Sequence, residues 1–148
     1  MNFDRTRSTG YMTNWAARMF ARAIDVRLRP LGLSSGYMPV IFALANGAAL
    51  SQRALTEAAS IEQPTMAATL SRMQRDGLVE KRPDPRDGRS ALYSLSPLGM
   101  ERTTQVREAG QAVNKTAMEG LNEAERELFL ASLAVVVHNL EKSLADRD

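Results

Sequence analysis

Apolar residues between positions 63 and 74 recur at the spacing of one helical face. Met66, Leu70 and Met73 stand at i, i+4 and i+7, which predicts a helix with one buried side. The opposite side is short-chained and uncharged for two turns and then ends in arginine: Pro64, Thr65, Ala68, Thr69 and Arg72. An ordinary solvated face mixes Glu and Lys throughout. Side chains this small would let the helix approach another surface closely.

A second short helix is predicted just upstream, over Ser51–Ser60. Its first residue suits the N-cap, because a serine oxygen can accept a hydrogen bond from an otherwise unpaired backbone N–H. Leu50 and Leu55 stand at the two positions of a hydrophobic staple. The connection that follows leaves room only for a tight turn before Pro64, which suits the first position of the next helix.

Residues 77–96 follow a different pattern, in which two short β-type runs flank a loop of prolines, aspartates, a glycine and arginines. This pattern predicts a β-hairpin. The order helix, tight turn, helix and hairpin is that of a winged helix-turn-helix, whose second helix enters the DNA major groove. The predicted fold class is therefore mainly α with a small β-hairpin (α+β), a winged helix-turn-helix core flanked by N- and C-terminal helices.

Helix caps and apolar periods predict four further helices. They run from about Thr9 to Arg29, from Ser34 or Ser35 to near Asn46-Gly47, from Ser96-Pro97 to about Gly120, and from Asn122 to about Leu144. Pro30 and Gly32 end the first of them. Glu125 stands at the third helical position of the last helix, completing a capping box with its N-cap asparagine.

Residues 31–99 resemble the multiple antibiotic resistance regulator (MarR) family of bacterial repressors. The resemblance is carried by Gly77-Leu78-Val79, by the Asp-Pro-x-Asp-x-Arg wing at Asp84–Arg89 and by Leu95-Ser96-x-x-Gly99. Two positions depart from the family pattern. Gly88 stands where the family often has another arginine, and Pro39 interrupts the helix that begins near Ser35. We expect the first departure to weaken the wing's grip on DNA, with Arg86 as a substitute.

The last helix is apolar over too wide an arc for one packing neighbour. Its main stripe consists of Phe129, Leu133, Val136, Val137, Leu140 and Leu144, and Leu130, Ala134 and Val135 widen it. A two-fold dimer would cover this surface and set two recognition helices about 34–36 Å apart on a near-palindromic site. The resemblance also implies a homodimer formed through the terminal helices. A stripe buried within one subunit is the alternative.

This interpretation divides the chain into three regions. Residues 1–32 form an N-terminal helix of the dimerisation region, 33–96 the winged helix-turn-helix domain, and 97–148 the C-terminal dimerisation helices. The function predicted is that of a DNA-binding transcriptional regulator, most consistent with a repressor of a pseudo-palindromic operator. A winged-helix protein-interaction module without DNA binding is the alternative, although it would not need Thr65, Thr69, Arg72 and Arg89 together.

Base recognition is assigned to the helix over 63–76, placed in the major groove. Thr65 and Thr69 can bond to base edges, Ala68 can contact a thymine methyl, and Arg72 can reach guanine or phosphate. Further contacts from the helix starts are assigned to Gln52, Gln63 and Pro64, the two glutamines as phosphate contacts. The alternative is that this surface is only a solvated helix face.

The wing, residues 82–91, is assigned to the minor groove. Arg89 is the candidate for insertion there, since narrow A·T-rich grooves attract arginine. Arg86 and Lys81 are assigned to the DNA backbone. Asp84 and Asp87 are poorly suited to touch DNA, and we expect them to close the turn onto its own backbone and to orient a neighbouring guanidinium in a charge-assisted pair. An ordinary solvated turn is the alternative for this loop.

The charge of the chain is divided unevenly along its length. The net charge is only +2, but residues 1–107 hold 15 Lys and Arg against 9 Asp and Glu, whereas residues 108–148 hold 4 against 8. The basic part contains the predicted DNA-binding unit, so its local field favours nucleic acid and makes binding salt-dependent. The acidic part should face away from DNA.

Several functional classes find no support in the sequence. There is no cysteine, no Gly-rich phosphate loop and a single histidine, His138, so we predict neither an enzyme nor a metal site nor a cofactor. His138 lies in the apolar last helix, where a hydrogen-bonded packing role is usual. We also expect no membrane-spanning run and no signal peptide, and a cytoplasmic location.

The family resemblance implies that a small aromatic or phenolic effector binds between the DNA-binding lobe and the dimerisation helices. Candidate lining residues are Tyr11, Trp15, Met19, Met38 and Phe42, because aromatic and methionine side chains supply much of the contact area in pockets. The alternative is that these residues are ordinary core, since stripes of this kind at helical spacing usually are. With no cysteine, any sensing would be non-covalent.

Overall fold

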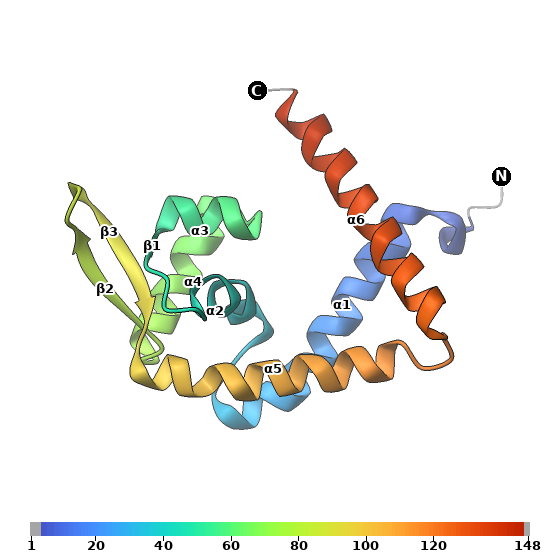
Figure 1. Cartoon of the computed structure of the whole chain (residues 1–148), viewed down its shortest axis with the longest axis horizontal. Coiled ribbons are helices and arrows are strands. Elements are labelled where there is room, and N and C mark those ends of the chain that lie inside the picture. The colour runs from blue at the N-terminus through green and yellow to red at the C-terminus, as the bar shows by residue number, and fades with distance from the viewer. Residues whose placement is uncertain (1–3, 147–148) are drawn as a thin grey trace. The chain divides into compact units, whose positions relative to one another are not determined.

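The computed structural model describes residues 4–146 and confirms the α+β class, with several α-helices and one small antiparallel sheet (Figure 1). The α-helices are α1 Thr9–Leu28, α2 Met38–Leu44, α3 Gln52–Ala59, α4 Gln63–Arg75, α5 Pro97–Ala117 and α6 Glu123–Ala145. The strands are β1 Leu50–Ser51, β2 Val79–Asp84 and β3 Asp87–Leu95, and short 3-10 turns are η1 Arg5–Arg7, η2 Arg29–Leu31 and η3 Ser35–Tyr37. The chain divides into two compact units, one ending at Val113 and one beginning at Asn114.

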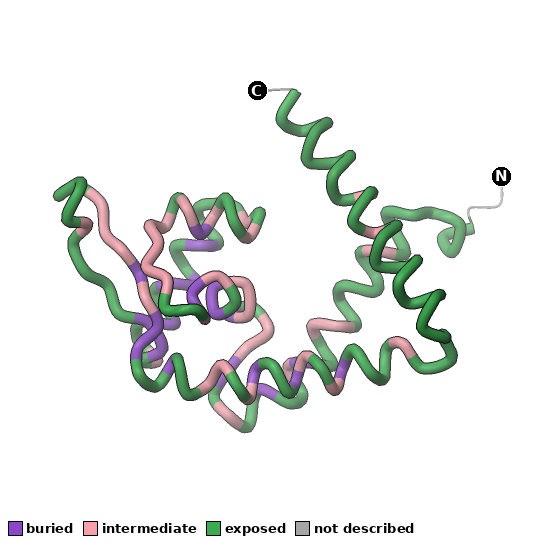
Figure 2. Tube along the Cα trace, viewed as in Figure 1, coloured by how far each residue is buried: buried purple, intermediate pink, exposed green. Residues whose placement is uncertain are grey.

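The hydrophobic core lies in the first unit, where buried stretches of the trace gather on α2, on α4 and at the base of the hairpin (Figure 2). Leu28 of α1, Leu44 of α2, Leu55 of α3 and Val106 of α5 are fully buried. Every helix of this unit therefore contributes to one core. That core fixes the positions of α3, α4 and the hairpin relative to one another.

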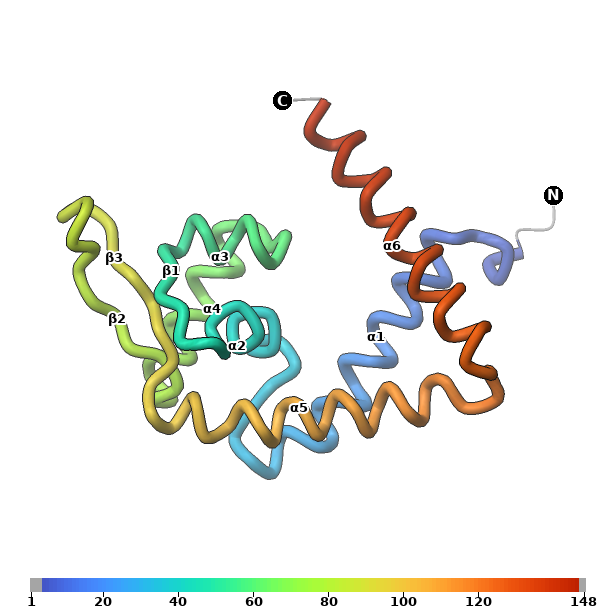
Figure 3. Tube along the Cα trace, viewed as in Figure 1, coloured from blue at the N-terminus to red at the C-terminus, as the bar shows by residue number. Residues whose placement is uncertain are grey.

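The helix-turn-helix is connected as the sequence predicts, and the trace in Figure 3 passes directly from α3 into α4. Ser51 caps α3 by accepting from the Ala54 backbone N–H at 3.1 Å. The turn depends on Ser60, which adopts the left-handed conformation with φ of 51°. Pro64 lies at the second position of α4, one residue later than expected, where its missing N–H is still harmless.

The end of α4 is fixed by a Schellman motif. Gly77 has a φ of 74°, the Gly77 N–H donates to the Gln74 carbonyl, and the Leu78 N–H donates to the Met73 carbonyl at 2.9 Å. Leu78 and Met73 are both buried, which supplies the hydrophobic contact of this motif. The Gly-Leu-Val sequence therefore stops the helix and directs the chain into β2.

The sheet has three strands in the order β1-β3-β2, one more than the predicted hairpin. In the hairpin, Val79 pairs with Leu95 and Lys81 with Tyr93, and an irregularity follows Pro83. Strand β1 adds Leu50 opposite Tyr93 and Ser51 opposite Leu92. The strand was missed because two residues are too few to show a period. It ties the start of α3 to the wing.

The start of α5 is joined closely to the end of α4. The Ser96 hydroxyl donates to the Gly77 carbonyl and accepts from the Gly99 N–H, while the Ser96 N–H donates to the Leu78 carbonyl. Gly99 lies so near this carbonyl that a Cβ atom would collide with it. The Ser-x-x-Gly pattern is therefore a packing requirement, and it couples α5 to the helix-turn-helix.

The sequence suggested that Pro39 interrupts a helix, and this expectation is wrong. It lies in the first turn of α2, after the separate 3-10 turn over Ser35–Tyr37. This position needs no backbone donor from proline.

The second unit contains α6, which begins with the predicted capping box between Asn122 and Glu125. By length and composition α6 qualifies as a membrane span, so the expectation that no segment would do so is wrong. Its uncharged stretch, Leu128–Leu140, has 13 residues. That is about 20 Å of helix, short of the roughly 30 Å of a hydrocarbon core.

Candidate nucleic-acid interface

Helix α4 presents an exposed face opposite its core stripe, as predicted, but with one residue on the wrong side. Pro64, Thr65, Ala68 and Arg72 are exposed. Thr69 is only 4% exposed and lies in the core stripe, so its assignment to base edges is wrong. Position 69 follows Met66 by three residues, which puts it on the buried face whatever its polarity.

The exposed face of α4 includes residues that the sequence analysis did not assign. Pro64, Ala68, Ser71 and Arg75 are exposed at i, i+4, i+7 and i+11, a single row along the helix. Ala67 is also exposed beside this row. The helical period alone would have identified Ser71 and Arg75. The surface is small-chained at the start of α4 and basic at its end.

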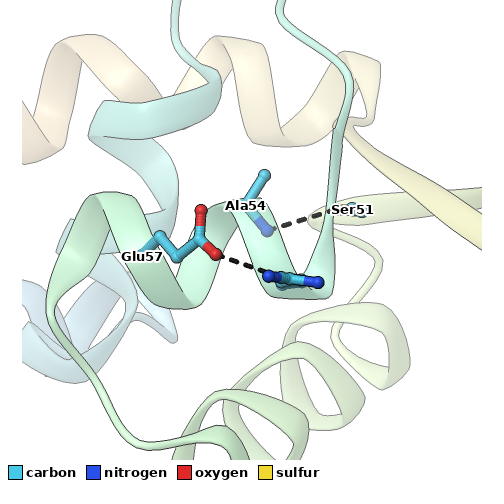
Figure 4. A network of polar contacts seen from close by, with 4 residues as sticks. Ser51, Ala54 and Glu57 are labelled. Atoms are coloured by element: carbon cyan, nitrogen blue, oxygen red, sulfur yellow. Dashed lines mark hydrogen bonds and ion pairs between the residues drawn. The ribbon is translucent and has the colours of Figure 1, made fainter. Parts of the chain in front are cut away.

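The starts of α3 and α4 are joined by a side-chain hydrogen bond between their first residues. Gln52 Nε2 donates to Gln63 Oε1 at 3.0 Å. Further along α3, Arg53 Nε contacts Glu57 Oε1 at 3.1 Å, next to the Ser51 cap (Figure 4). The two glutamines assigned to phosphate contacts therefore lie together, and the unpaired N–H groups at helix starts suit an anion.

The wing turn is closed by its aspartates, as predicted. Asp84 Oδ1 accepts from the Arg86 backbone N–H at 2.9 Å, and Asp87 Oδ1 accepts from the Arg89 N–H at 3.0 Å. These are Asx turns, which shape the loop locally. Within residues 4–146, neither aspartate forms an ion pair with an arginine, so the expectation that they orient a guanidinium is wrong. Arg86 and Arg89 are exposed, with their guanidinium groups available to a ligand.

Two other cations lie on β2. The Lys81 ammonium lies 5.8 Å from the centre of the Tyr93 ring, its cross-strand neighbour, and this stacking orders the lysine. Arg82 is exposed and pairs with Leu92 on β3. Because side chains alternate along a strand, Arg82 lies on the face of the hairpin opposite to Lys81. Arg82 was not assigned individually, although it lies within the wing.

A polar link connects the end of α4 to the turn before α2. The Tyr37 hydroxyl donates to Asp76 Oδ2 at 2.7 Å, and Arg75 Nε lies 3.2 Å from Asp76 Oδ1. The Tyr37 bond holds the pKa of Asp76 below its usual value, with help from Arg75 and Arg72. Burial, and then the bond to Asp76, raise the pKa of Tyr37. At neutral pH the pair is a neutral donor and a charged acceptor.

Comparison with known proteins identifies the family that shares this arrangement. The MarR family model matches residues 31–90, from the end of η2 to the wing. Transcriptional regulator HosA of Escherichia coli O111:H- is 33% identical over 91 residues, covering 62% of this chain and 67% of HosA. This chain belongs to the MarR family. It is a DNA-binding, winged-helix transcriptional regulator.

Two further proteins extend the similarity to almost the whole chain. The HTH-type transcriptional repressor IacR of Pseudomonas putida is 26% identical over 141 residues, covering 93% of this chain and 84% of IacR. The structure of Bordetella bronchiseptica BpsR, whose DNA binding is regulated by 6-hydroxynicotinic acid, has a TM-score of 0.83 at 21% identity and covers 93% of this chain and 98% of BpsR. IacR is named a transcriptional repressor, and the similarity to BpsR is one of fold.

The residues proposed to line an effector site are mostly exposed in the single MarR-family chain. Tyr11, Trp15 and Met19 on α1 and Phe42 on α2 are exposed, whereas Met38 packs against the core. Tyr11 and Trp15 form an edge-to-face pair with ring centres 6.1 Å apart. Arg5 lies over both rings, at 5.9 and 5.4 Å. Within residues 4–146, these aromatic and cation–π contacts join Tyr11 and Trp15 but include none of the other three candidates.

Helix α6 of this MarR-family chain has no fully buried residue, and Figure 2 shows it exposed or half-buried throughout. Phe129, Val137, Leu140 and Leu144 are exposed, and Leu133 and Val136 are half-buried. His138 is also exposed in this single chain.

Proposed function

We propose that this MarR-family protein is a homodimeric repressor that binds a pseudo-palindromic operator, with α4 in the major groove and wing residues 82–91 in the minor groove. The observation that carries the proposal is the exposed row on α4, which lies opposite a buried stripe and beside an ordered basic wing. The short side chains of this row allow the helix to approach DNA closely, and the arginines at its end and on the wing supply positive charge.

Close approach is the role proposed for the first half of the row. Pro64 and Ala68 add little bulk, so the helix backbone can sit deep in a groove about 12 Å wide. Thr65 can then bond to a base edge, and Arg72 can form a bidentate pair with guanine. Ser71 takes the place that Thr69 had in the sequence-based assignment, because it is exposed and its hydroxyl can donate or accept.

The wing supplies the second part of the proposed contact. The Asx bonds fix the backbone on either side of the tip, which leaves Arg89 to enter the minor groove and Arg86 to meet phosphate. Lys81 remains a proposed backbone contact. Gly88 offers no side chain here, so the two arginines carry most of the wing's contribution.

Dimerisation through the terminal helices is proposed from the exposed apolar surface of α6. Contiguous exposed apolar surface of this kind usually marks an interface, and a two-fold axis would present two copies of α4 to the two operator halves. On this proposal the dimerisation regions are residues 1–32 and 97–148, around a DNA-binding domain of residues 33–96, in a cytoplasmic protein.

Effector release is proposed by analogy with a relative. The DNA binding of BpsR is regulated by 6-hydroxynicotinic acid, and IacR is named a repressor. We infer a small aromatic or phenolic effector for this chain as well, binding near Tyr11, Trp15, Met19, Met38 and Phe42. Titration with a panel of aromatic acids should change Trp15 fluorescence and release operator DNA. No change in either signal would exclude effectors of this class at this site.

A salt series tests the proposed function. The affinity of the purified protein is measured for the DNA flanking its own gene and for random duplex, across a range of salt concentrations. Both affinities should fall steeply with salt, with an excess for one flanking site. Binding that ignores salt and sequence would instead favour the alternative, a winged-helix protein-interaction module.

A further inference from the structure

Arg75 occupies a distinctive place on the proposed reading helix. It ends the exposed row that begins at Pro64, in the last turn of α4. Arg75 lies seven residues beyond Ala68, which is about 10 Å along the helix axis. A helix centred on Ala68 in a groove about 12 Å wide therefore carries Arg75 past the base edges to the phosphates at the groove wall.

The guanidinium of Arg75 is held by its neighbour although most of its surface is free. Its side chain is 71% exposed, while that of Asp76 is 29% exposed. The contact uses Nε of the arginine and Oδ1 of the aspartate. Both terminal nitrogens remain free to donate, which is the arrangement a phosphate oxygen needs.

The aspartate is held in turn by a residue of the core. Tyr37 is only 5% exposed and belongs to the hydrophobic core, and its hydroxyl donates to the second oxygen of Asp76. One carboxylate therefore bridges a buried hydroxyl and an exposed guanidinium. By contrast, Glu57 holds Arg53 on α3 with both side chains largely exposed.

An aspartate at this position needs an explanation. It caps the C-terminal end of a helix, where the helix dipole disfavours negative charge, and it belongs to an element proposed to approach phosphates. Its charge is compensated by the Tyr37 bond and by Arg75. Residues at i and i+1 do not normally face each other on a helix, and here they meet because the helix ends between them.

We propose that Tyr37 and Asp76 are positioning residues that set Arg75 as a phosphate contact at the wall of the major groove. The inference rests on the proposed function of α4 and adds a contact and its support. Arg75 contributes to affinity for every sequence, whereas the residues nearer the start of α4 choose bases. Tyr37 acts only through Arg75, by limiting the positions that the guanidinium explores before DNA arrives.

A double-mutant cycle on the full-length protein tests this chain of contacts. Binding to one promoter duplex is measured over a salt series for wild type, Arg75→Ala, Tyr37→Phe and the double variant. Arg75→Ala should reduce the slope of log affinity against log salt by about 0.9 for each bound subunit. Tyr37→Phe should weaken binding about 2- to 10-fold, the effect of freeing one long side chain. In the Arg75→Ala background the same change should have no effect.

Two further variants separate positioning from stability. Arg75→Lys keeps the charge but lacks Nε, so it should retain the salt slope and become insensitive to Tyr37→Phe. Val113→Ala removes buried volume on α5, far in sequence from this contact, and should lower stability without changing the slope. These controls are measured at a temperature where every variant is folded.

The possible results divide cleanly. An equal loss of DNA affinity from Tyr37→Phe in the wild-type and Arg75→Ala backgrounds would overturn the inference. It would show that the Tyr37 hydroxyl stabilises the fold and does not act through Arg75. Wild-type affinity and slope in Arg75→Ala would overturn it too, while leaving the proposed function intact. A wild-type protein without salt-dependent DNA binding would overturn both proposals.

Discussion

The close approach between α5 and the end of α4 makes Gly99→Ala a sharp test of the fold. A Cβ at Gly99 would collide with the Leu78 carbonyl oxygen, and would lie 3.1 Å from its carbonyl carbon and 3.2 Å from Leu95 Cδ2. The obstacle is backbone, so α5 must move away. Overpacking of this kind costs about 1–3 kcal/mol. The movement also strains two hydrogen bonds of Ser96, each worth about 1 kcal/mol.

The higher helix propensity of alanine offsets part of this loss, because alanine is more favourable than glycine in a helix by up to about 1 kcal/mol. We therefore expect a net loss of about 2 kcal/mol in the free energy of unfolding, or roughly 4–8 °C in melting temperature. Urea unfolding at fixed protein concentration measures this loss, because the proposed dimerisation would make stability depend on protein concentration.

Gly110→Ala is the matched control, in the middle of the same helix. Its new Cβ would meet only Met38 Cε, at an ordinary 3.7 Å. The substitution should stabilise the protein by about 0.4–1 kcal/mol. The two alanines should therefore act in opposite directions. Equal stability of the two variants would refute the idea that Gly99 is required by packing.

Three further predictions follow from individual side chains. Thr69→Val should leave base preference unchanged, because Thr69 is buried and the bond that its hydroxyl accepts from Arg72 Nη2 is long, at 3.5 Å; altered base preference in binding-site selection would contradict this. Leu140→Asp should shift the protein to a monomer in sedimentation at micromolar concentration, since Leu140 is exposed within one subunit; an unchanged dimer would exclude α6 as the interface. Asp76→Asn should lower stability at neutral pH and flatten its acid dependence. Because the pKa of Asp76 is lowered on folding, its contribution is present above about 3.8 and is lost as pH falls further; parallel acid profiles would refute it.

Local patterns were sufficient to predict much of the fold. The Ser51 cap, the Asn122 capping box and the Asx turns of the wing each depend on side chains within a few residues of the groups they bond. Such interactions are encoded by spacing alone, and all of them are present.

Long-range features were the ones that the sequence did not reveal. Tyr37 and Asp76 are 39 positions apart, and only the folded core brings them together. Strand β1 exists because Leu50 and Ser51 meet β3. Thr69 was misassigned for a different reason, since its polarity was weighed above its helical position.

The apolar surface of α6 was predicted from the sequence, but the single chain does not identify its binding partner. Its apolar stripe was recognised from the sequence, and most of its residues are exposed in the single chain. Exposed apolar surface favours burial against another surface but does not identify that surface. Dimerisation therefore stays a prediction.

The most direct test of the proposed function compares two arginine variants on one operator. Affinity is measured for every single-base variant of the site, using wild type, Arg72→Ala and Arg89→Ala. Arg72→Ala should lose preference, worth about 1–3 kcal/mol, at one base pair in each half-site, whereas Arg89→Ala should weaken all sequences about equally. Uniform weakening by Arg72→Ala, or full preference in both variants, would contradict base reading by this face of α4.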